Sequence, residues 1–232
     1  GIEVLTDLSW EYSEEYNNAK CIIVNMCDRD LSKFDSVLEE LKGRFGRNIF
    51  PFTFPVNEGE NFNQIADVLK KEILEFDASG NYSSKGTDGD WESKLSTLYE
   101  ELIEMVAESD ESLLETFFDK GELTDDELKG GLRLAVKNGL VPVFCSSGEK
   151  NVGTKRILEV LAKYGVVASD REHAAKQGEN DLSVDCKDND LSAIVFKTLS
   201  EEHVGELSFF RIYSGALKSG DDVENTSRNS TR

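Results

Sequence analysis

The stretch Cys21-Ile-Ile-Val-Asn-Met-Cys-Asp28 decides the predicted fold. Its apolar, β-branched start predicts a strand that is buried on both faces, and the strand ends at two polar residues, Asn25 and Asp28. In open α/β sheets, ligands bind in the crevice beyond the carboxyl ends of the strands. An amide and a carboxylate at this place suit a base with both donors and acceptors, because a carboxylate can take two N–H bonds. The alternative is an ordinary turn with an Asx cap.

A second apolar run, Leu140-Val-Pro-Val-Phe-Cys145, also ends in small polar residues, Ser146, Ser147 and Gly148. A helix is expected after it, from about 152 to 164, as one is expected at 31–45 after the first run. Strands that end in a polar loop and lead into a helix are typical of a doubly wound α/β sheet. We therefore predict that residues 21–24 and 141–144 are neighbouring parallel strands.

Other segments of the chain carry weaker or more local signals. Pro51 inside the apolar run 49–54 favours an edge strand. The segment 65–76 fits both helical and strand spacing, and residues 77–90, rich in Gly, Ser and Asp, are expected to form a loop. Apolar residues at helical spacing, together with the capping box Thr124-Asp-Asp-Glu127, predict further helices at 2–16, 91–107, 110–119 and 124–138.

The helix predicted at 91–107 separates an apolar stripe from a dense acidic one. The acidic residues are Glu100, Glu101, Glu104 and Glu108. One interpretation is a solvated helix face, and the other is an acidic surface that docks a partner.

Composition limits the function classes. A chain of 232 residues with 38% hydrophobic and 31% charged residues is typical of one or two soluble globular domains. The net charge of −20 argues against direct binding to nucleic acid, whose phosphates are also negative. We expect no membrane span and no signal peptide. The cysteines, Cys21, Cys27, Cys145 and Cys186, form no C-x-x-C pair, so we expect free thiols in a reducing cytosol and no zinc site.

The character of the sequence changes near residue 167. Residues 168–189 are acidic and aperiodic, which predicts a linker between domains. Alternation at 192–199 and 205–213, followed by turn residues, predicts two strands that begin an all-β barrel or sandwich. We expect the chain to end within this second domain. His173 and His203 are interpreted as ordinary surface residues.

Taken in order, several phrases of the chain resemble bacterial translation elongation factor G. They are Gly1-Ile-Glu-Val with Trp10-Glu-Tyr, Ile23-Val-Asn-Met-Cys-Asp-Arg29, Phe34-Asp, Arg44-Phe-Gly-Arg47, Phe144-Cys-Ser-Ser147 with Lys150-Asn-Val-Gly153, Val195-Phe-Lys, and Phe209-Phe-Arg-Ile-Tyr-Ser-Gly-Ala-Leu-Lys-Ser-Gly220. The resemblance implies that residues 1–167 are the C-terminal portion of a P-loop-type GTPase domain with a helical insertion at about 55–139. Residues 190–232 would then begin the β-barrel second domain. The insertion favours the elongation factor over the ribosomal-protection GTPases.

The same resemblance assigns a nucleotide-binding site. Asn25, Met26 and Asp28 match the guanine-specificity motif Asn-Lys-x-Asp, and Ser147 and Gly148 match the loop whose backbone N–H faces the guanine oxygen. Met26 stands where the family has Lys, so it keeps apolar stacking on the base but supplies no charge. We expect this change to weaken nucleotide binding by roughly tenfold to a hundredfold, or about 1–3 kcal/mol.

The chain contains neither G-x-x-x-x-G-K-[ST] nor Asp-x-x-Gly-His, so no catalytic or metal-ligating residue is assigned. The resemblance implies that GTP or GDP binds in a parent protein whose other residues hold the phosphates and Mg²⁺. The piece alone is expected to hydrolyse no GTP and to bind nucleotide more weakly than the micromolar range. The parent would act in the cytoplasm on the ribosome, in the translocation step. The alternatives are a ribosome-binding paralogue with weak or no GTPase activity, and an acidic module that docks to the ribosomal stalk.

Overall fold

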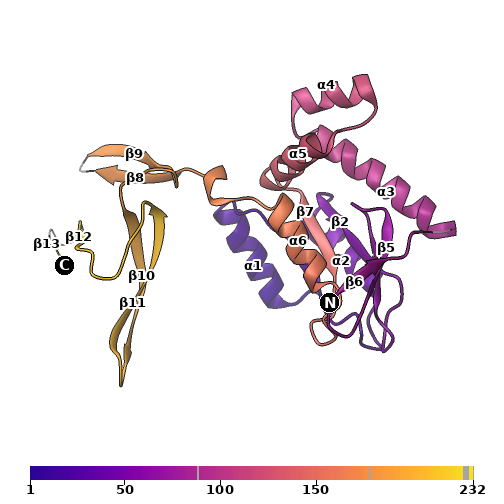
Figure 1. Ribbon diagram of the computed structural model, residues 1–232, viewed down its shortest axis with the longest axis horizontal. Coiled ribbons are helices and arrows are strands. Elements are labelled where there is room, and N and C mark those ends of the chain that lie inside the picture. Colours follow the sequence, from indigo (N-terminus) through magenta and orange to yellow (C-terminus); the bar gives the residue numbers. More distant parts are fainter. Residues whose placement is uncertain (88, 178, 227–229, 232) are drawn as a thin grey trace. The chain divides into compact units, whose positions relative to one another are not determined.

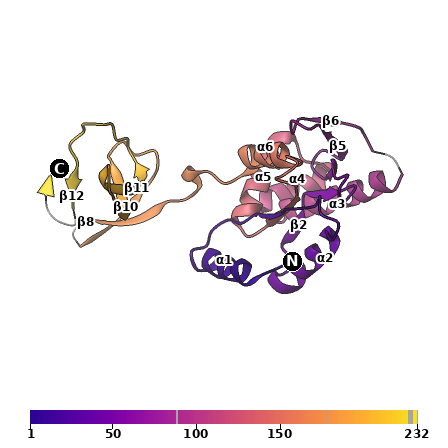
Figure 2. The same cartoon turned by 90° about the horizontal axis from the view of Figure 1, so that it is seen from below.

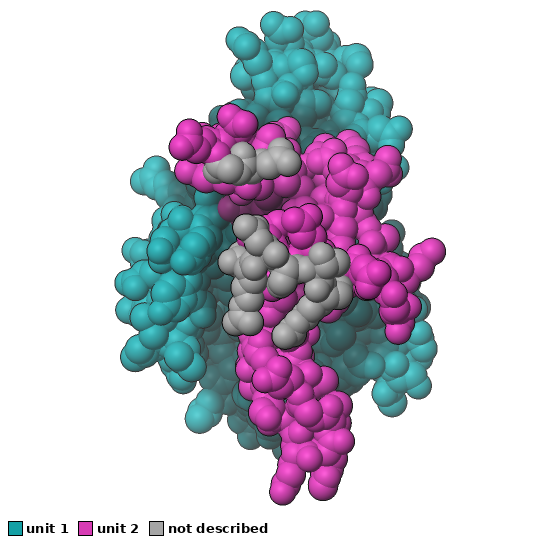
Figure 3. Space-filling model, turned by 90° about the vertical axis from the view of Figure 1, so that its left-hand side faces the viewer, with its two compact units in different colours: residues 1–166 teal, residues 167–232 magenta. Residues whose placement is uncertain are grey.

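The computed structural model describes residues 1–87, 89–177, 179–226 and 230–231. The chain divides into two compact units, Gly1–Val166 and Val167–Arg232 (Figure 3). The first unit mixes helices with a parallel and an antiparallel sheet, and the described residues of the second unit form antiparallel strand pairs and a short 3-10 helix, Ala168–Asp170. The mixed α/β character expected for the first unit is confirmed.

The first unit begins with alternating helices and strands, continues with a run of strands and then a run of helices, and ends with a strand and a helix (Figure 1). The helices are α1 (Val4–Glu15), α2 (Phe34–Phe45), α3 (Gly89–Ala107), α4 (Glu111–Lys120), α5 (Asp125–Lys137) and α6 (Thr154–Tyr164). The strands are β1 (Ile22–Val24), β2 (Ile49–Pro51), β3 (Thr53–Pro55), β4 (Gln64–Asp67), β5 (Glu72–Phe76), β6 (Tyr82–Ser84) and β7 (Val141–Cys145).

A three-stranded parallel sheet with the order β1-β7-β2 forms the centre of this unit. The pairs Ile22↔Val143 and Ile49↔Val141 set its register, so β1 and β7 are neighbouring parallel strands as predicted. All residues of β7 are buried. In Figure 2, α1 and α2 lie on one side of this sheet and α5 and α6 on the other. Because helices cover both faces of the sheet, the sequence of the middle strand, β7, is apolar without interruption.

Strand β1 is less buried than its sequence predicts. Ile22 and Val24 are half-buried, while Ile23 is 47% exposed and Cys21 is also exposed. The expectation of burial on both faces was therefore wrong. The physical reason is that β1 is an edge strand of the described sheet, with β7 on one side only.

An antiparallel sheet of order β3-β4-β5-β6 follows the parallel one. The segment 65–76, whose spacing fitted both a helix and a strand, forms most of the hairpin β4–β5. The loop predicted at 77–90 is wrong in part, because β6 lies within it and pairs with β5. The insertion expected to be helical from residue 55 therefore begins with strands, and helix starts only at Gly89. Asp88 lies outside the described residues. Burial alternates along the end of β5, where Leu74 and Phe76 are buried and Glu75 is only partly buried, whereas Ile65, Ala66 and Asp67 of β4 are all buried.

The helices predicted at 91–107, 110–119 and 124–138 are present as α3, α4 and α5. Leu95, Leu102 and Val106 of α3 are fully buried. Helix α4 begins where the Asp110 side chain accepts bonds from the next turn, and α5 begins with the expected capping box, in which Thr124 N–H donates to Glu127 at 2.8 Å. Gly131 lets α5 approach closely, because a Cβ there would lie 2.7 Å from Val106 Cγ1 of α3.

The second unit is built from paired strands. Its described pairs are β8 (His173–Gln177) with β9 (Asn180–Val184), β10 (Ser192–Glu201) with β11 (Gly205–Ser214), and β12 (Glu224–Asn225) with β13 (Ser230–Thr231), all antiparallel. The long β10–β11 hairpin confirms the two strands predicted there. The linker predicted at 168–189 is corrected, since it contains β8–β9; the described side chains of this hairpin are largely exposed, so no apolar alternation marks it. His173 is not simply a surface residue, because its ring packs edge-on against Tyr213.

Candidate functional site

The two polar loops that follow β1 and β7 lie against each other. The Asn25 side-chain oxygen accepts bonds from the Gly148 N–H at 2.9 Å and from the Ser146 hydroxyl at 3.3 Å. Backbone bonds join the same loops, because Ser146 N–H donates to Val24 O and Cys27 N–H donates to Ser146 O. Carboxyl ends of neighbouring parallel strands meet at one edge of a sheet, so residues more than a hundred positions apart come together here.

Asp28 is held as a buried acceptor within this loop pair. The residue is only 7% exposed, and the Ser147 hydroxyl donates to its carboxylate, which lowers the pKa of Asp28. Ser147 is itself fully buried, and its oxygen accepts the Lys150 N–H at 3.1 Å. Asp28 is therefore ionised at neutral pH and can accept hydrogen bonds from a ligand.

Met26 forms the tip of the first loop. Its side chain is 60% exposed, and its φ of +66° lies in the left-handed region that non-glycine residues rarely adopt. The Met26 carbonyl accepts the Arg29 N–H, which closes a turn from Met26 to Arg29. The turn leaves the Met26 thioether open to solvent at the site, where it can offer an apolar surface and no charge.

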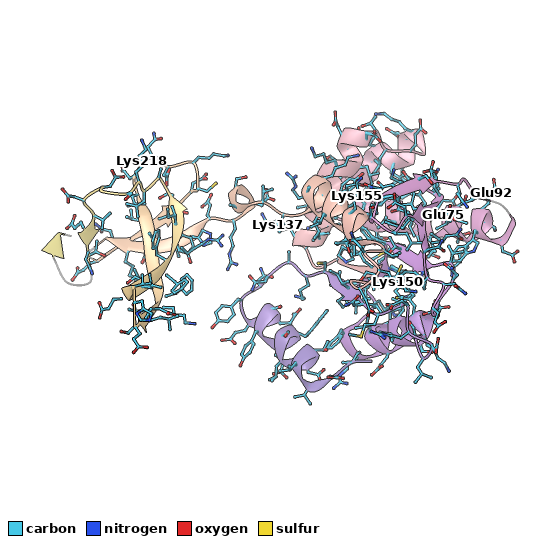
Figure 4. All side chains as sticks on the ribbon, turned by 60° about the horizontal axis from the view of Figure 1, so that its bottom comes forward. Glu75, Glu92, Lys137, Lys150, Lys155 and Lys218 are labelled. Atoms are coloured by element: carbon cyan, nitrogen blue, oxygen red, sulfur yellow. The ribbon has the colours of Figure 1, made fainter. Side chains whose placement is uncertain are left out.

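Charged residues that the motif comparison did not single out border the site. Arg29 donates to Glu149 at 2.6 Å and places its guanidinium Nε 3.9 Å from the Asp28 carboxylate. Lys150, labelled in Figure 4, donates its ammonium to the Glu60 carbonyl. Arg29 directly follows Asp28 in the sequence, so its proximity could have been predicted, whereas its partner Glu149 lies 120 positions away.

The loop pair supplies both hydrogen-bond acceptors and a backbone donor. Asp28 and Asn25 supply acceptor oxygens, and Gly148 supplies a backbone N–H donor. Because this N–H already donates to the Asn25 side chain, it could bind a ligand only by breaking that hydrogen bond or by donating to both acceptors. All five predicted residues, Asn25, Met26, Asp28, Ser147 and Gly148, lie in this one loop pair. Within the described parts of the chain, no group of three His, Cys, Asp or Glu side chains is arranged to hold a metal ion. Two cavities, of about 450 and 190 Å³, are lined by other residues.

Comparison with known proteins identifies the fold alone. No family model matches the chain. The structure is similar to the crystal structure of ttk003000868 from Thermus thermophilus, with a TM-score of 0.81 and 24% sequence identity over 98% of this chain. The chain spans only about a third of the length of that protein, because the match covers 32% of it. Among the described residues, no helix combines the length and the apolar character needed to cross a bilayer.

Proposed function

We propose that the first unit is the base-binding portion of a translational GTPase similar to elongation factor G, which acts in the cytoplasm on the ribosome during translocation. The observation that carries this proposal is the convergence of Asn25, Asp28, Ser147 and Gly148 at the carboxyl ends of two neighbouring parallel strands. Convergence of these residue types in this order supports a site for one edge of a planar base.

Guanine fits the donors and acceptors of this site. Its ring N–H and exocyclic amino group would donate to the Asp28 carboxylate, and its carbonyl would accept the Gly148 N–H, while Asn25 would serve a ring nitrogen. Adenine presents the opposite pattern at the same positions, since it has an acceptor where guanine has a ring N–H. The proposal therefore predicts that guanine binds more tightly than adenine, because adenine would leave polar groups of the site without hydrogen-bond partners.

The sequence contains no G-x-x-x-x-G-K-[ST], so the phosphates of GTP or GDP, and their Mg²⁺, would be held by residues outside the given sequence. Met26 favours a variant of the same proposal. A ribosome-binding paralogue with weak or no GTPase activity would tolerate the loss of a cation beside the base.

Nucleosides test the base site without requiring a phosphate site. We would titrate ¹⁵N-labelled protein with guanosine, inosine and adenosine at millimolar concentration and follow backbone amide resonances. Guanosine is expected to shift the amides of Asn25 and Gly148, and inosine, which lacks the exocyclic amino group, to bind about tenfold more weakly. Asp28→Asn should remove the preference, and Asp30→Asn, at a neighbouring exposed carboxylate, should retain it. Equal shifts with guanosine and adenosine would contradict the proposal.

We further propose that the insertion docks a basic partner, with the ribosomal stalk protein as the candidate. The acidic stripe, defined as Glu100, Glu101, Glu104 and Glu108, is exposed. The opposite side of α3 packs into the core through Leu95, Leu102 and Val106, so the stripe is carried by a packed helix and by Glu108 directly after it. Among the described residues, no ion pair within 4.0 Å neutralises the stripe. A fixed and unneutralised acidic surface supports electrostatic recognition.

A further inference from the structure

A third loop meets both loops of the candidate site. It spans residues 56–63 and joins β3 to β4. Its Gly59 N–H donates to the Cys27 carbonyl, in the first site loop, at 2.9 Å. The next carbonyl, that of Glu60, accepts the ammonium of Lys150, which stands in the second site loop (Figure 4). Consecutive residues of the third loop therefore hold one site loop each.

Glu58 extends this contact to the end of the first site loop. One of its carboxylate oxygens accepts the Phe34 N–H at 2.8 Å and the Ser32 hydroxyl at 2.9 Å. Phe34 begins α2, so the carboxylate satisfies one of the N–H groups that a helix leaves unpaired at its N-terminus. Ser32 in turn donates its N–H to the Arg29 carbonyl at 2.9 Å. Glu58 thus fixes the segment that leads from the first site loop into α2.

The third loop is itself held in place. Phe62 anchors it in the core with 1% of its surface exposed, and the Phe62 N–H donates to the Gly59 carbonyl at 2.9 Å. The side-chain oxygen of Asn57 accepts the Gln64 N–H at 3.2 Å, and its side-chain nitrogen donates to the Asn63 side chain at 3.1 Å. A loop with a buried anchor and internal hydrogen bonds can fix the positions of the loops that it contacts.

We propose that residues 58–60 position the two site loops against each other, with Glu58 and Gly59 as positioning residues. Their effect on guanine binding rests on the proposed function, since neither belongs to the five residues assigned to the base. They act through Asn25 and Gly148, whose hydrogen bond joins the two site loops. A bound group needs its hydrogen-bonding partners held within about 0.5 Å of the productive geometry, so a loosened loop pair lowers the affinity for a base.

Amide hydrogen exchange of the free protein tests the positioning role without a ligand. Glu58→Ala removes the oxygen that holds Ser32 and Phe34, whereas Glu58→Gln keeps an acceptor at that place. The amides to follow are those of Cys27 and Gly148, because each donates from one site loop to the other. Exchange at both should be about tenfold faster in Glu58→Ala and close to wild type in Glu58→Gln, while the amides of β7 should stay unchanged.

A pair of glycine variants tests the same role through binding. Gly59 and Gly121 have φ angles of +89° and +74°, in a region that side chains disfavour. An added Cβ would lie 3.9 Å from Asp30 at Gly59 and would meet nothing within 4 Å at Gly121, so neither variant creates a clash. Both substitutions add backbone strain, but only Gly59→Ala strains the third loop. In the guanosine titration, Gly59→Ala should bind about tenfold more weakly than Gly121→Ala.

The outcomes separate this inference from the proposed function. If guanosine shifts no amide of the wild type, base binding is contradicted, and the exchange rates alone decide whether residues 58–60 hold the loops. Unchanged exchange at Cys27 and Gly148 in Glu58→Ala would overturn the positioning role. An equal acceleration in β7 would also overturn it, since that result would report a general loss of stability. Where the wild type does bind guanosine, equal affinities in the two glycine variants would overturn it as well.

Discussion

The Asp67 carboxylate accepts two hydrogen bonds from the Arg156 guanidinium, at 2.6 Å from Nε and 3.2 Å from Nη2, and both side chains are buried. The pair joins α6, which follows the second site loop, to β4 of the antiparallel sheet. Glu159 extends the contact, because it lies 3.7 Å from Arg156 and accepts the Tyr82 hydroxyl. Burial and this carboxylate together raise the pKa of Tyr82 to about 12. A polar network therefore ties α6 to strands β4 and β6 of the antiparallel sheet.

Arg156→Met is expected to lower the free energy of unfolding of the first unit by about 3–5 kcal/mol. The loss is expected because the substitution leaves the buried Asp67 carboxylate without the guanidinium of Arg156. Urea unfolding followed by tryptophan fluorescence measures this unit alone, because the chain's 2 tryptophans, Trp10 and Trp91, both lie in it.

The matched control for this experiment is Arg44→Met. Arg44 pairs with Asp7 at 2.6 Å, but both side chains are partly exposed to solvent. Such pairs contribute about 0–1 kcal/mol, so the control should be nearly as stable as the wild type. Similar losses in the two variants would mean that the buried pair contributes nothing beyond a surface ion pair.

The pH dependence of stability should reveal the ionised Asp28. The Ser147 hydroxyl lowers the pKa of Asp28 in the folded state below its unfolded value. Such a group stabilises the fold above the unfolded pKa of about 3.9, and this stabilisation is lost as the pH falls through the folded pKa. Wild type should therefore be more stable than Asp28→Asn at pH about 7, and the difference should shrink as the pH falls below about 3.9. Urea midpoints measured across this range give the comparison, and a constant gap would argue against an ionised Asp28.

Thiol reactivity should separate the cysteines into two classes. Burial raises the pKa of Cys27 to about 11 and also raises the pKa of Cys145, so neither forms a thiolate readily at neutral pH. Partial burial also raises the pKa of Cys21 and of Cys186, but both residues retain solvent exposure, so a reagent can reach their thiols. A native-state reaction with an aromatic disulfide reagent should therefore show two fast thiols, with the other two released only in denaturant. One uniform rate for all four would contradict the burial of Cys27 and Cys145.

The sequence predicted the elements whose signals are local and strong. The apolar run 141–145 is buried on both faces, so its pattern is continuous, and the helix start at Thr124 is specified by a side-chain cap. Strand β6 was missed because its residues Tyr82–Ser84 are largely exposed and its short run resembles a loop. Helix α1 was predicted from spacing, but none of its residues is buried, because spacing does not tell what covers a helix.

The residues of the candidate site could be predicted, but their bonds could not. The Gly148 N–H was expected to face a base, whereas in the structure it donates to Asn25. The left-handed conformation of Met26 also leaves no sequence signal, since glycine or asparagine would be the usual choice. Both features depend on how two loops meet, and that depends on the tertiary fold.

Met26→Lys is expected to strengthen binding of GDP by about tenfold, within the proposed function. The substitution would restore an ammonium beside the base and keep an aliphatic stem for stacking. Titration of the ¹⁵N-labelled chain with GDP at millimolar concentration gives the affinity from backbone amide shifts, with Met26→Leu as the control that changes the side chain but adds no charge. Equal affinities in the Lys and Leu variants would show that charge at this exposed position does not matter.

The final prediction concerns the acidic stripe and rests on its proposed docking role. Reversal of Glu100, Glu101 and Glu104 to Lys is expected to weaken binding of the ribosomal stalk protein at least tenfold at low salt. Exposed charges act mainly by steering the partner, so the loss should appear in the association rate. At 1 M salt the Debye length falls to about 3 Å, and wild type and variant should then bind alike.

A charge-matched control separates the stripe from net charge. Reversal of Asp35, Glu39 and Glu40, which are exposed on α2, changes the total charge by the same amount at a different surface. Surface plasmon resonance at low and high salt would compare the two variants with the wild type. A specific docking surface requires the α3 variant to lose association rate while the α2 variant keeps most of it. If both variants lose the same amount, attraction depends only on the overall charge of −20, and the stripe serves solvation alone.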